Sequence, residues 1–183
     1  MNEIIFDEKM EEDINNDFTT LPIPANNEIA NPSDFYKMAF QFQKIMLIYE
    51  SAIKQVETKL DILNKESKVN RKRNPIETVK SRIKTPDSIA AKLEKKNLPV
   101  TFESMMKNLN DIAGIRVICP YISDIYAVRD MLLKQPDLNL VLEHDYIEEP
   151  KQSGYRSLHI VVETGGVAHV ATGIVKGAVR RLA

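Results

Sequence analysis

Residues 111–119 read DIAGIRVIC, an apolar run that begins with an acidic residue and contains a single arginine. Its length and its branched side chains predict a buried β-strand from Ile112 to Cys119. Segments with helical and with strand-like patterns alternate on both sides of this run. The alternation predicts a mixed α/β fold, in which helices flank one β-sheet.

The neighbouring elements follow from capping residues and periodicity. Thr85 can cap a helix whose first turn accommodates Pro86, and Ser123 marks the start of another helix. The expected helices cover residues 85–96, 102–109 and 124–134. The other expected strands cover residues 76–84, 138–144 and 157–163.

A long N-terminal helix is predicted to begin near Asn31. Apolar residues recur after it at steps of three and four, which places them on one helix face. They are Phe35, Met38, Phe42, Ile45, Tyr49, Ile53, Val56, Leu60 and Leu63. We expect this face to pack against the rest of the domain.

The composition of the 183-residue chain predicts one domain, residues 31–183, after an acidic leader. Residues 1–30 hold few large apolar side chains, so we expect them to be loosely ordered. No apolar run could span a bilayer and the N-terminus lacks a signal-peptide pattern, so we expect a cytoplasmic protein without membrane contact. Cys119, the single cysteine, is expected to be a buried and inert thiol.

Charge is distributed unevenly although the net charge is only -1. Residues 1–30 carry eight acidic residues and one lysine, whereas residues 65–96 carry eleven basic and four acidic residues. A local basic segment in a nearly neutral chain indicates an anionic ligand, such as nucleotide phosphates, or a small RNA footprint. A solvated helix face explains the same composition, so this observation leaves the alternatives open.

The first candidate binding motif runs from Arg82 to Lys92. Strand alternation places Arg82 and Lys84 on one side, and the next helix directs its free N–H groups toward the same strand end. Ser88 and Lys92, one turn apart, would extend a cradle for polyphosphate. The alternative is that these side chains are merely solvated.

The second motif is the strand start itself. Asp111 can supply a carboxylate to Mg²⁺, and Arg116 a planar cation that stacks on a base. The alternative makes Asp111 a cap and Arg116 a surface ion-pair partner.

The third motif, DYIEEPKQSGYRSLH, covers residues 145–159. A loop hinged at Gly154 presents Tyr155 among cationic side chains, which suits stacking on a purine while the cations meet its phosphates. A lysine beside an aromatic residue is common, but this full string is much more specific.

The motifs R-x-K-x-x-x-S, D-I-A-G-I-R and P-K-x-x-G-Y-R-S-L-H occur here in an order and spacing that resemble RelA/SpoT-type (p)ppGpp synthetase domains. The resemblance covers residues 74–163, and the short chain is similar to the stand-alone small alarmone synthetases. It implies a nucleotidyltransferase-like mixed sheet, Mg²⁺ as cofactor, and transfer of pyrophosphate from ATP to the 3′-hydroxyl of GTP or GDP in stringent-response signalling. It also implies a homo-oligomer, commonly a tetramer.

The resemblance assigns a role to each motif residue. Around ATP, the adenine would lie between Arg82 and Arg116, and the phosphates would contact Lys84, Ser88 and Lys92. Asp111 would bind Mg²⁺ and, with Lys84, act in catalysis. Around GTP or GDP, Tyr155 would stack on guanine, with Lys151 and His159 near the phosphates and Ser153 where the family often has asparagine.

The C-terminal stretch departs from the family pattern. A glutamate in an E-x-Q-x-R strand, expected some twenty-odd residues after the tyrosine loop, would activate the acceptor hydroxyl. Residues 164–183 contain no acidic residue, and Glu163 is the last carboxylate. This atypical end predicts a sheet that lacks its C-terminal strand, and it leaves the oligomer without the helices that normally build it.

Three hypotheses follow from this departure. The chain is an active synthetase, a catalytically inactive nucleotide-binding or regulatory module, or a relative that pyrophosphorylates adenine nucleotides or the 3′ end of tRNA.

Overall fold

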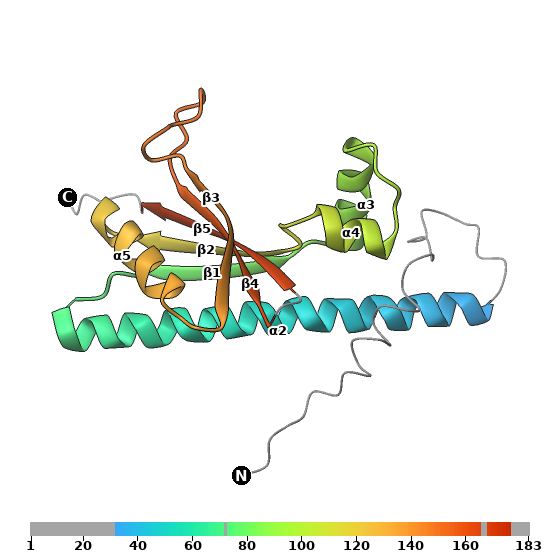
Figure 1. Cartoon of the computed structure of the whole chain (residues 1–183), viewed down its shortest axis with the longest axis horizontal. Coiled ribbons are helices and arrows are strands. Elements are labelled where there is room, and N and C mark those ends of the chain that lie inside the picture. Colours follow the sequence, from blue (N-terminus) through green and yellow to red (C-terminus); the bar gives the residue numbers. More distant parts are fainter. Residues whose placement is uncertain (1–31, 72, 166–167, 177–183) are drawn as a thin grey trace, which may run out of the picture. The chain divides into compact units, whose positions relative to one another are not determined.

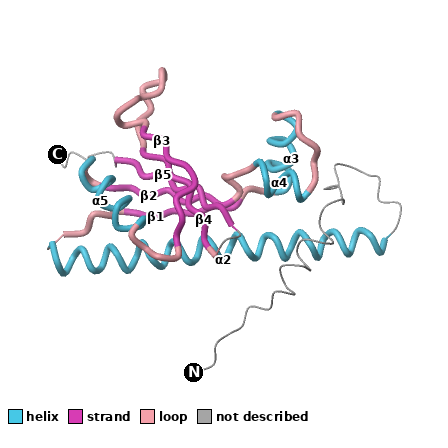
Figure 2. Tube along the Cα trace, viewed as in Figure 1, coloured by secondary structure: helices cyan, strands magenta, loops and turns pink. Residues whose placement is uncertain are grey.

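The computed structural model describes residues 32–71, 73–165 and 168–176, and its elements are labelled in Figure 1. Five strands and four helices make up this part of the chain, so the predicted mixed fold is confirmed (Figure 2). The expected acidic leader lies outside the described residues. The chain divides into two compact units, one of Met1–Ile45 and Thr85–Leu109, the other of Met46–Lys84 and Asn110–Ala183.

The second unit contains the whole sheet, whose strands follow the order β1-β2-β5-β4-β3. The strands are β1 (Thr78–Ile83), β2 (Ala113–Cys119), β3 (Leu138–Asp145), β4 (Leu158–Thr164) and β5 (Ala168–Lys176). β2 and β5 are parallel, and the other neighbours are antiparallel. The sheet therefore has β1 and β3 as its edges.

The position of β5 corrects one expectation from the sequence. The stretch after Glu163 was expected to leave the sheet without its C-terminal strand, and this is wrong. Residues 168–176 form the middle strand, paired with β2 on one side and β4 on the other. Val170, Thr172 and Ile174 alternate into the core, which is the pattern that a half-buried strand requires even without the E-x-Q-x-R motif.

One face of the sheet forms the core of the second unit. Its buried side chains come from the three inner strands: Ala113, Ile115 and Val117 on β2, Val170, Thr172 and Ile174 on β5, and Leu158, Ile160 and Val162 on β4. Helix α5 (Ile122–Leu133) packs against β2, β3 and β5. Cys119 is buried as expected, and burial raises the pKa of its thiol to about 12, which keeps the thiol protonated.

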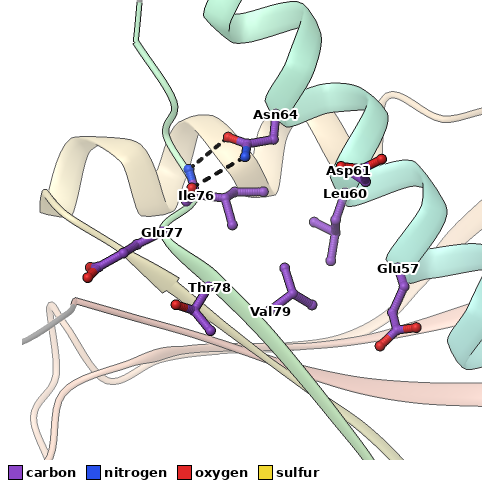
Figure 3. A pocket seen from close by; sticks show the side chains of 8 residues that line it. All are labelled: Glu57, Leu60, Asp61, Asn64, Ile76, Glu77, Thr78 and Val79. Carbon is purple, nitrogen blue, oxygen red and sulfur yellow. Dashed lines mark hydrogen bonds between the residues drawn. The ribbon is translucent and has the colours of Figure 1, made fainter.

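Helix α2 (Pro32–Arg71) confirms the predicted long helix and extends past its last predicted apolar residue. Within the second unit, Asn64 on α2 accepts a hydrogen bond from the backbone N–H of Ile76 (3.1 Å) and donates one to its carbonyl (3.3 Å), as Figure 3 shows. A cavity of about 210 Å³ lies beside this contact. Its lining includes Glu57, Asp61 and Glu77 but no basic side chain among the described residues, so it does not suit a phosphate.

The first unit contains two short capped helices, α3 (Pro86–Lys95) and α4 (Phe102–Asn108). The predicted cap is confirmed, because Thr85 Oγ1 accepts a hydrogen bond from the N–H of Ser88 (3.4 Å). Thr101 Oγ1 does the same for the N–H of Ser104 (3.1 Å). Within the described residues, no helix is long and apolar enough to cross a membrane.

Candidate functional site

A cavity of about 450 Å³ lies on the second unit, over the face of the sheet opposite the core. Its volume falls in the range of small-molecule sites, which is roughly 300–1,000 Å³. Five residues singled out in the sequence line it, namely Arg82, Asp111, Arg116, Tyr155 and His159. The fold thus brings together parts of all three motifs, although they are far apart in the sequence.

Two glycines keep the floor of the cavity low. A Cβ added to Gly114 would lie 3.8 Å from the carbonyl oxygen of Arg82, and one added to Gly173 would lie 4.0 Å from Nε2 of His159. Both distances are ordinary van der Waals contacts, so the backbone tolerates a methyl group. A longer side chain would rise into the space that a ligand would occupy.

Arg82 and Arg116 are exposed on neighbouring strands and lie on the same face. Arg82 pairs with Gly114 and Lys80 pairs with Arg116, so the two arginines are diagonal neighbours across β1 and β2. Diagonal positions of an antiparallel pair are about 7–8 Å apart. Both side chains can therefore reach a ligand over this face, and the adenine sandwich between them stays a prediction.

Lys84 and Asp111, the two predicted catalytic residues, are in contact. Lys84 Nζ lies 3.2 Å from Oδ2 of Asp111, and the lysine side chain is 16% exposed while that of the aspartate is 37% exposed. The backbone N–H of Lys84 also donates to the carbonyl of Ile112 (2.9 Å), which fixes the end of β1 against the start of β2. The contact places a carboxylate and a cation together at one end of the cavity.

The described side chains at this cavity could supply only part of the coordination shell of a metal ion. No group of three or more histidine, cysteine, aspartate or glutamate side chains in the described ranges could hold an ion. Mg²⁺ is usually held by one or two carboxylates together with substrate phosphates and water. Asp111, which lines the cavity, suits this shared mode of binding and would have to exchange Lys84 for the ion.

Ser88 and Lys92 lie on α3 in the first unit. The Ser88 hydroxyl is 2.9 Å from that of Thr85 and is exposed, and Lys92 is half-buried. Neither residue lines the cavity. Their predicted contact with ATP phosphates therefore stays a prediction.

The tyrosine loop connects β3 to β4 and closes on itself. Gly154 has a φ of 75°, in the left-handed region that favours glycine, so the loop turns at the glycine singled out in the sequence. Its N–H donates to the carbonyl of Lys151 (2.8 Å), and the N–H of Lys151 donates to the carbonyl of Tyr155 (3.3 Å). Ser153 is exposed between them. The turn holds Lys151 near the ring of Tyr155, with Nζ 5.7 Å from the ring centroid.

Tyr155 and His159 belong to a cluster of aromatic rings that has two further members, and neither was predicted from the sequence. Tyr146 lies edge-on to His159 at 5.4 Å between ring centroids, and Lys151 Nζ lies 4.3 Å from the centre of the Tyr146 ring. His144 stacks on Tyr146 at 5.8 Å and is the strand partner of His159. Alternation back from Asp145 would have placed His144 and Tyr146 on one side of the strand end, but only the register identifies His159 as their neighbour.

The surroundings of His159 favour the neutral form of its ring. Burial is the main cause that lowers its pKa below the ordinary 6.5, and the charges of Lys151, His144 and Arg116 lower it further. Its Nε2 shares a hydrogen bond with the Tyr155 hydroxyl at 3.2 Å. An anionic ligand among these cations would oppose the charge effect and raise the pKa of His159.

The comparisons with known proteins agree with one another. A sequence model described as a region found in RelA and SpoT proteins matches residues 81–174. The chain is 38% identical over 135 residues to the GTP pyrophosphokinase YwaC of Bacillus subtilis, with 74% of this chain and 64% of the relative covered. It is 34% identical over 122 residues to the GTP pyrophosphokinase YjbM of the same organism, with 67% and 56% covered. The chain thus spans less than two thirds of these two curated relatives.

Solved structures show the same likeness. A GTP pyrophosphokinase family protein from Streptococcus pneumoniae superposes with a TM-score of 0.68 at 31% identity, covering 74% of this chain and 70% of that one. The small alarmone synthetase 1 of Bacillus subtilis, bound to its product pppGpp, superposes with a TM-score of 0.64 at 32% identity, covering 74% and 72%. The matched sequence range ends inside β5, beyond residue 163 where the resemblance by motifs stopped.

Proposed function

Because the chain belongs to the RelA/SpoT family, which its matched region and its likeness to small alarmone synthetases establish, we propose that it transfers pyrophosphate from ATP to the 3′-hydroxyl of GTP or GDP. The product would be (p)ppGpp, a signal of the stringent response. GTP pyrophosphokinase activity is what the names of its relatives state.

The observation that carries this proposal is the division of the cavity into two differently built sides. Arg82 and Arg116 line it from β1 and β2, whereas Tyr155 and His159 line it from the end of the loop and β4. In the sheet, β5 lies between β2 on the arginine side and β4 on the tyrosine side. Two nucleotides bound on either side would meet above the low floor at Gly173, which is the geometry that transfer between them needs.

The donor would occupy the arginine side. Its adenine would stack between Arg82 and Arg116, and its phosphates would extend toward Lys84, with Ser88 and Lys92 as further ligands. Asp111 would hold Mg²⁺ jointly with these phosphates, and the bound ion would supply neutralisation of the charge that develops on them. Lys84, released from its pair with Asp111, would bind the phosphate oxygens.

The acceptor would occupy the tyrosine side. Guanine would stack on Tyr155, and its phosphates would meet Lys151 and His159, with Ser153 at the loop tip. The 3′-oxygen would attack the β-phosphorus of ATP while the bond to the α-phosphate oxygen breaks, so that AMP leaves. Positioning and charge neutralisation account for most of the acceleration in such phosphoryl transfers.

We also propose that the chain acts in the cytoplasm, where these nucleotides are available, and that it assembles into a homo-oligomer like similar synthetases. No contact of the described residues distinguishes an RNA acceptor. The tRNA alternative is therefore kept as an arm of the experiment below.

The test is transfer of label from ATP labelled at its γ-phosphate. Incubation of the purified full chain with this ATP, Mg²⁺ and GDP or GTP is expected to give a 3′-pyrophosphorylated guanine nucleotide, and Asp111→Ala is expected to give none. tRNA and adenine nucleotides are offered in parallel reactions, and label on either would replace the guanine acceptor.

The absence of any labelled product at high protein concentration would contradict the synthetase proposal. Binding of GDP that is lost in Tyr155→Ala but is never followed by turnover would instead assign an inactive nucleotide-binding module.

A further inference from the structure

A cluster of three polar side chains lies outside the residues predicted from the sequence. His169 on β5 places Nδ1 3.2 Å from Oδ1 of Asn110, and Nε2 3.7 Å from Oε1 of Glu163 on β4. His169 is 27% exposed and Glu163 is 28% exposed, so ligands can reach both while water surrounds neither fully. A carboxylate, an imidazole and an amide from three segments of the chain thus lie beside one another.

The register of the sheet places this cluster next to the cavity. Glu163 and His169 are direct partners across β4 and β5. His169 is two residues from Ala171 and therefore on the same face of β5, and Ala171 lines the cavity. Asn110 precedes Asp111, which also lines the cavity. The cluster accordingly lies at the Asp111 end of the floor.

The contacts of the ring determine which nitrogen can act as a base. When Oδ1 of Asn110 accepts, Nδ1 of His169 carries the proton and Nε2 keeps its lone pair. Oε1 of Glu163 lies 3.7 Å from Nε2, which is beyond hydrogen-bond distance but within the distance of an ion pair. A proton gained at Nε2 would be stabilised by the carboxylate beside it.

The other described groups around the cavity are less suited to take a proton. Asp111 has a lysine nitrogen 3.2 Å from its Oδ2 and is the residue proposed to hold Mg²⁺, so its carboxylate already has a role. His159 shares its Nε2 with the hydroxyl of Tyr155, and His144 is stacked on Tyr146. The chain has three histidines in all, and among the described residues His169 is the one with a carboxylate beside its Nε2.

We propose that His169 is the general base that takes the proton of the acceptor hydroxyl, with Asn110 orienting its ring and Glu163 stabilising the imidazolium that forms. The inference rests on the proposed function. The proton moves from the 3′-hydroxyl to Nε2 while the oxygen bonds to the β-phosphorus and the bond to the α-phosphate oxygen breaks. AMP leaves with that electron pair, and the imidazolium returns its proton to solvent.

This assignment gives the atypical strand a chemical function. The stretch after Glu163 lacks the carboxylate expected to activate the hydroxyl, yet the strand it forms carries an imidazole on the face that lines the cavity. The competing explanation is that Glu163 and His169 are a cross-strand pair that only stabilises the sheet. The two explanations predict different results when His169 is replaced. A general base predicts a lowered kcat, whereas a purely structural pair predicts a normal kcat in a folded variant.

The experiment measures kcat and KM for GDP with the full chain, saturating ATP and Mg²⁺. His169→Gln keeps a polar side chain but removes the base, and it is expected to lower kcat by about 10²- to 10⁴-fold with little change in KM. Glu163→Gln is expected to lower kcat less. Added imidazole is expected to restore part of the rate to His169→Ala but none to Asp111→Ala.

Glu143→Gln is the matched control, because Glu143 is also a strand glutamate with a 28% exposed side chain but pairs with Arg129 away from the cavity. Its kcat is expected to equal that of the unchanged chain. Circular dichroism and GDP affinity of His169→Gln show whether it folds and binds.

Three results would contradict the proposed role of His169. A normal kcat in a folded His169→Gln, with or without lowered stability, assigns the histidine to the sheet alone while the proposed function stands. A loss that imidazole does not restore in His169→Ala excludes the base. No turnover by the unchanged chain refutes the proposed function and, with it, the catalytic role of His169.

Discussion

At the scale of single residues, Gly173 offers a test of where the ligand lies. Leucine at this position would fill the cavity from its floor, whereas alanine would add a Cβ only 4.0 Å from His159 Nε2, an ordinary contact. Gly173→Leu is expected to weaken GDP binding by about 1–3 kcal/mol, roughly 5- to 150-fold in Kd, and Gly173→Ala to leave it nearly unchanged. Titration calorimetry measures both.

Thermal unfolding of both variants controls for a general loss of structure. Equal affinities of a folded Gly173→Leu and the unchanged chain would mean that the nucleotide does not occupy this cavity.

His159 predicts a pH dependence of stability with a definite sign. Its pKa is lowered in the folded chain, so the unfolded chain takes up the proton first as the pH falls. Its contribution to stability is therefore complete above about pH 6.5 and is lost as the pH falls from there through the folded-state pKa. Urea unfolding between pH 7.5 and 5 is expected to show a smaller loss in His159→Gln than in the unchanged chain.

Lys151→Gln supplies an independent readout, because Lys151 is the largest of the charges that lower the pKa of His159. An NMR titration is expected to give a higher pKa for His159 in this variant. The prediction is contradicted if His159→Gln and the unchanged chain lose stability equally with pH and if the pKa of His159 is the same in Lys151→Gln. These results would show that the neighbours of His159 do not change its pKa.

At the scale of elements, the central place of β5 can be tested by comparing strands. Ile174 on β5 is fully buried, whereas Leu142 on the edge strand β3 is 40% exposed. Ile174→Ala is expected to lower the free energy of unfolding by about 2–5 kcal/mol, and Leu142→Ala by less than about 1 kcal/mol. Urea denaturation measures both, and similar small losses would argue against β5 as the middle strand.

The elements also show what the sequence could and could not predict. The helix at Thr85 and the strand after Asp111 were predictable, because their caps and apolar runs are local signals. β5 was not predicted because its sequence lacks the family motif, although Val170, Thr172 and Ile174 alternate as a strand requires. Its strand period was readable, but its parallel pairing with β2 depends on the whole sheet.

The residues of the candidate site likewise fall into those that the sequence indicates and those that only the fold identifies. Arg82, Asp111 and Tyr155 carry family motifs, so the sequence indicated them, although their meeting in one cavity required the fold. His169 carries no motif and gains a partner only through its register with Glu163. Tyr146 likewise becomes part of the cluster only because β3 pairs with β4.

At the scale of the whole molecule, the residues matched to the family are those that form most of the sheet. The matched residues 81–174 begin inside β1 and end inside β5, so they reach all five strands. α2 precedes the matched range, and within the second unit it contributes buried residues such as Val56 and Leu60. The part of the chain matched to the family therefore includes the strands that carry the candidate site.

The late position of β5 in the chain has a consequence for how the sheet forms. β1 with β2, and β3 with β4, can each pair as separate ribbons, but the inner edges of both stay open until residues 168–176 enter between them. The β2–β5 contact joins Ala113 to Val170, a long loop to close, and such non-local pairing slows folding. On the ribosome, the strand that joins the two halves would be the last of the five to emerge, so the cavity would appear only when it does.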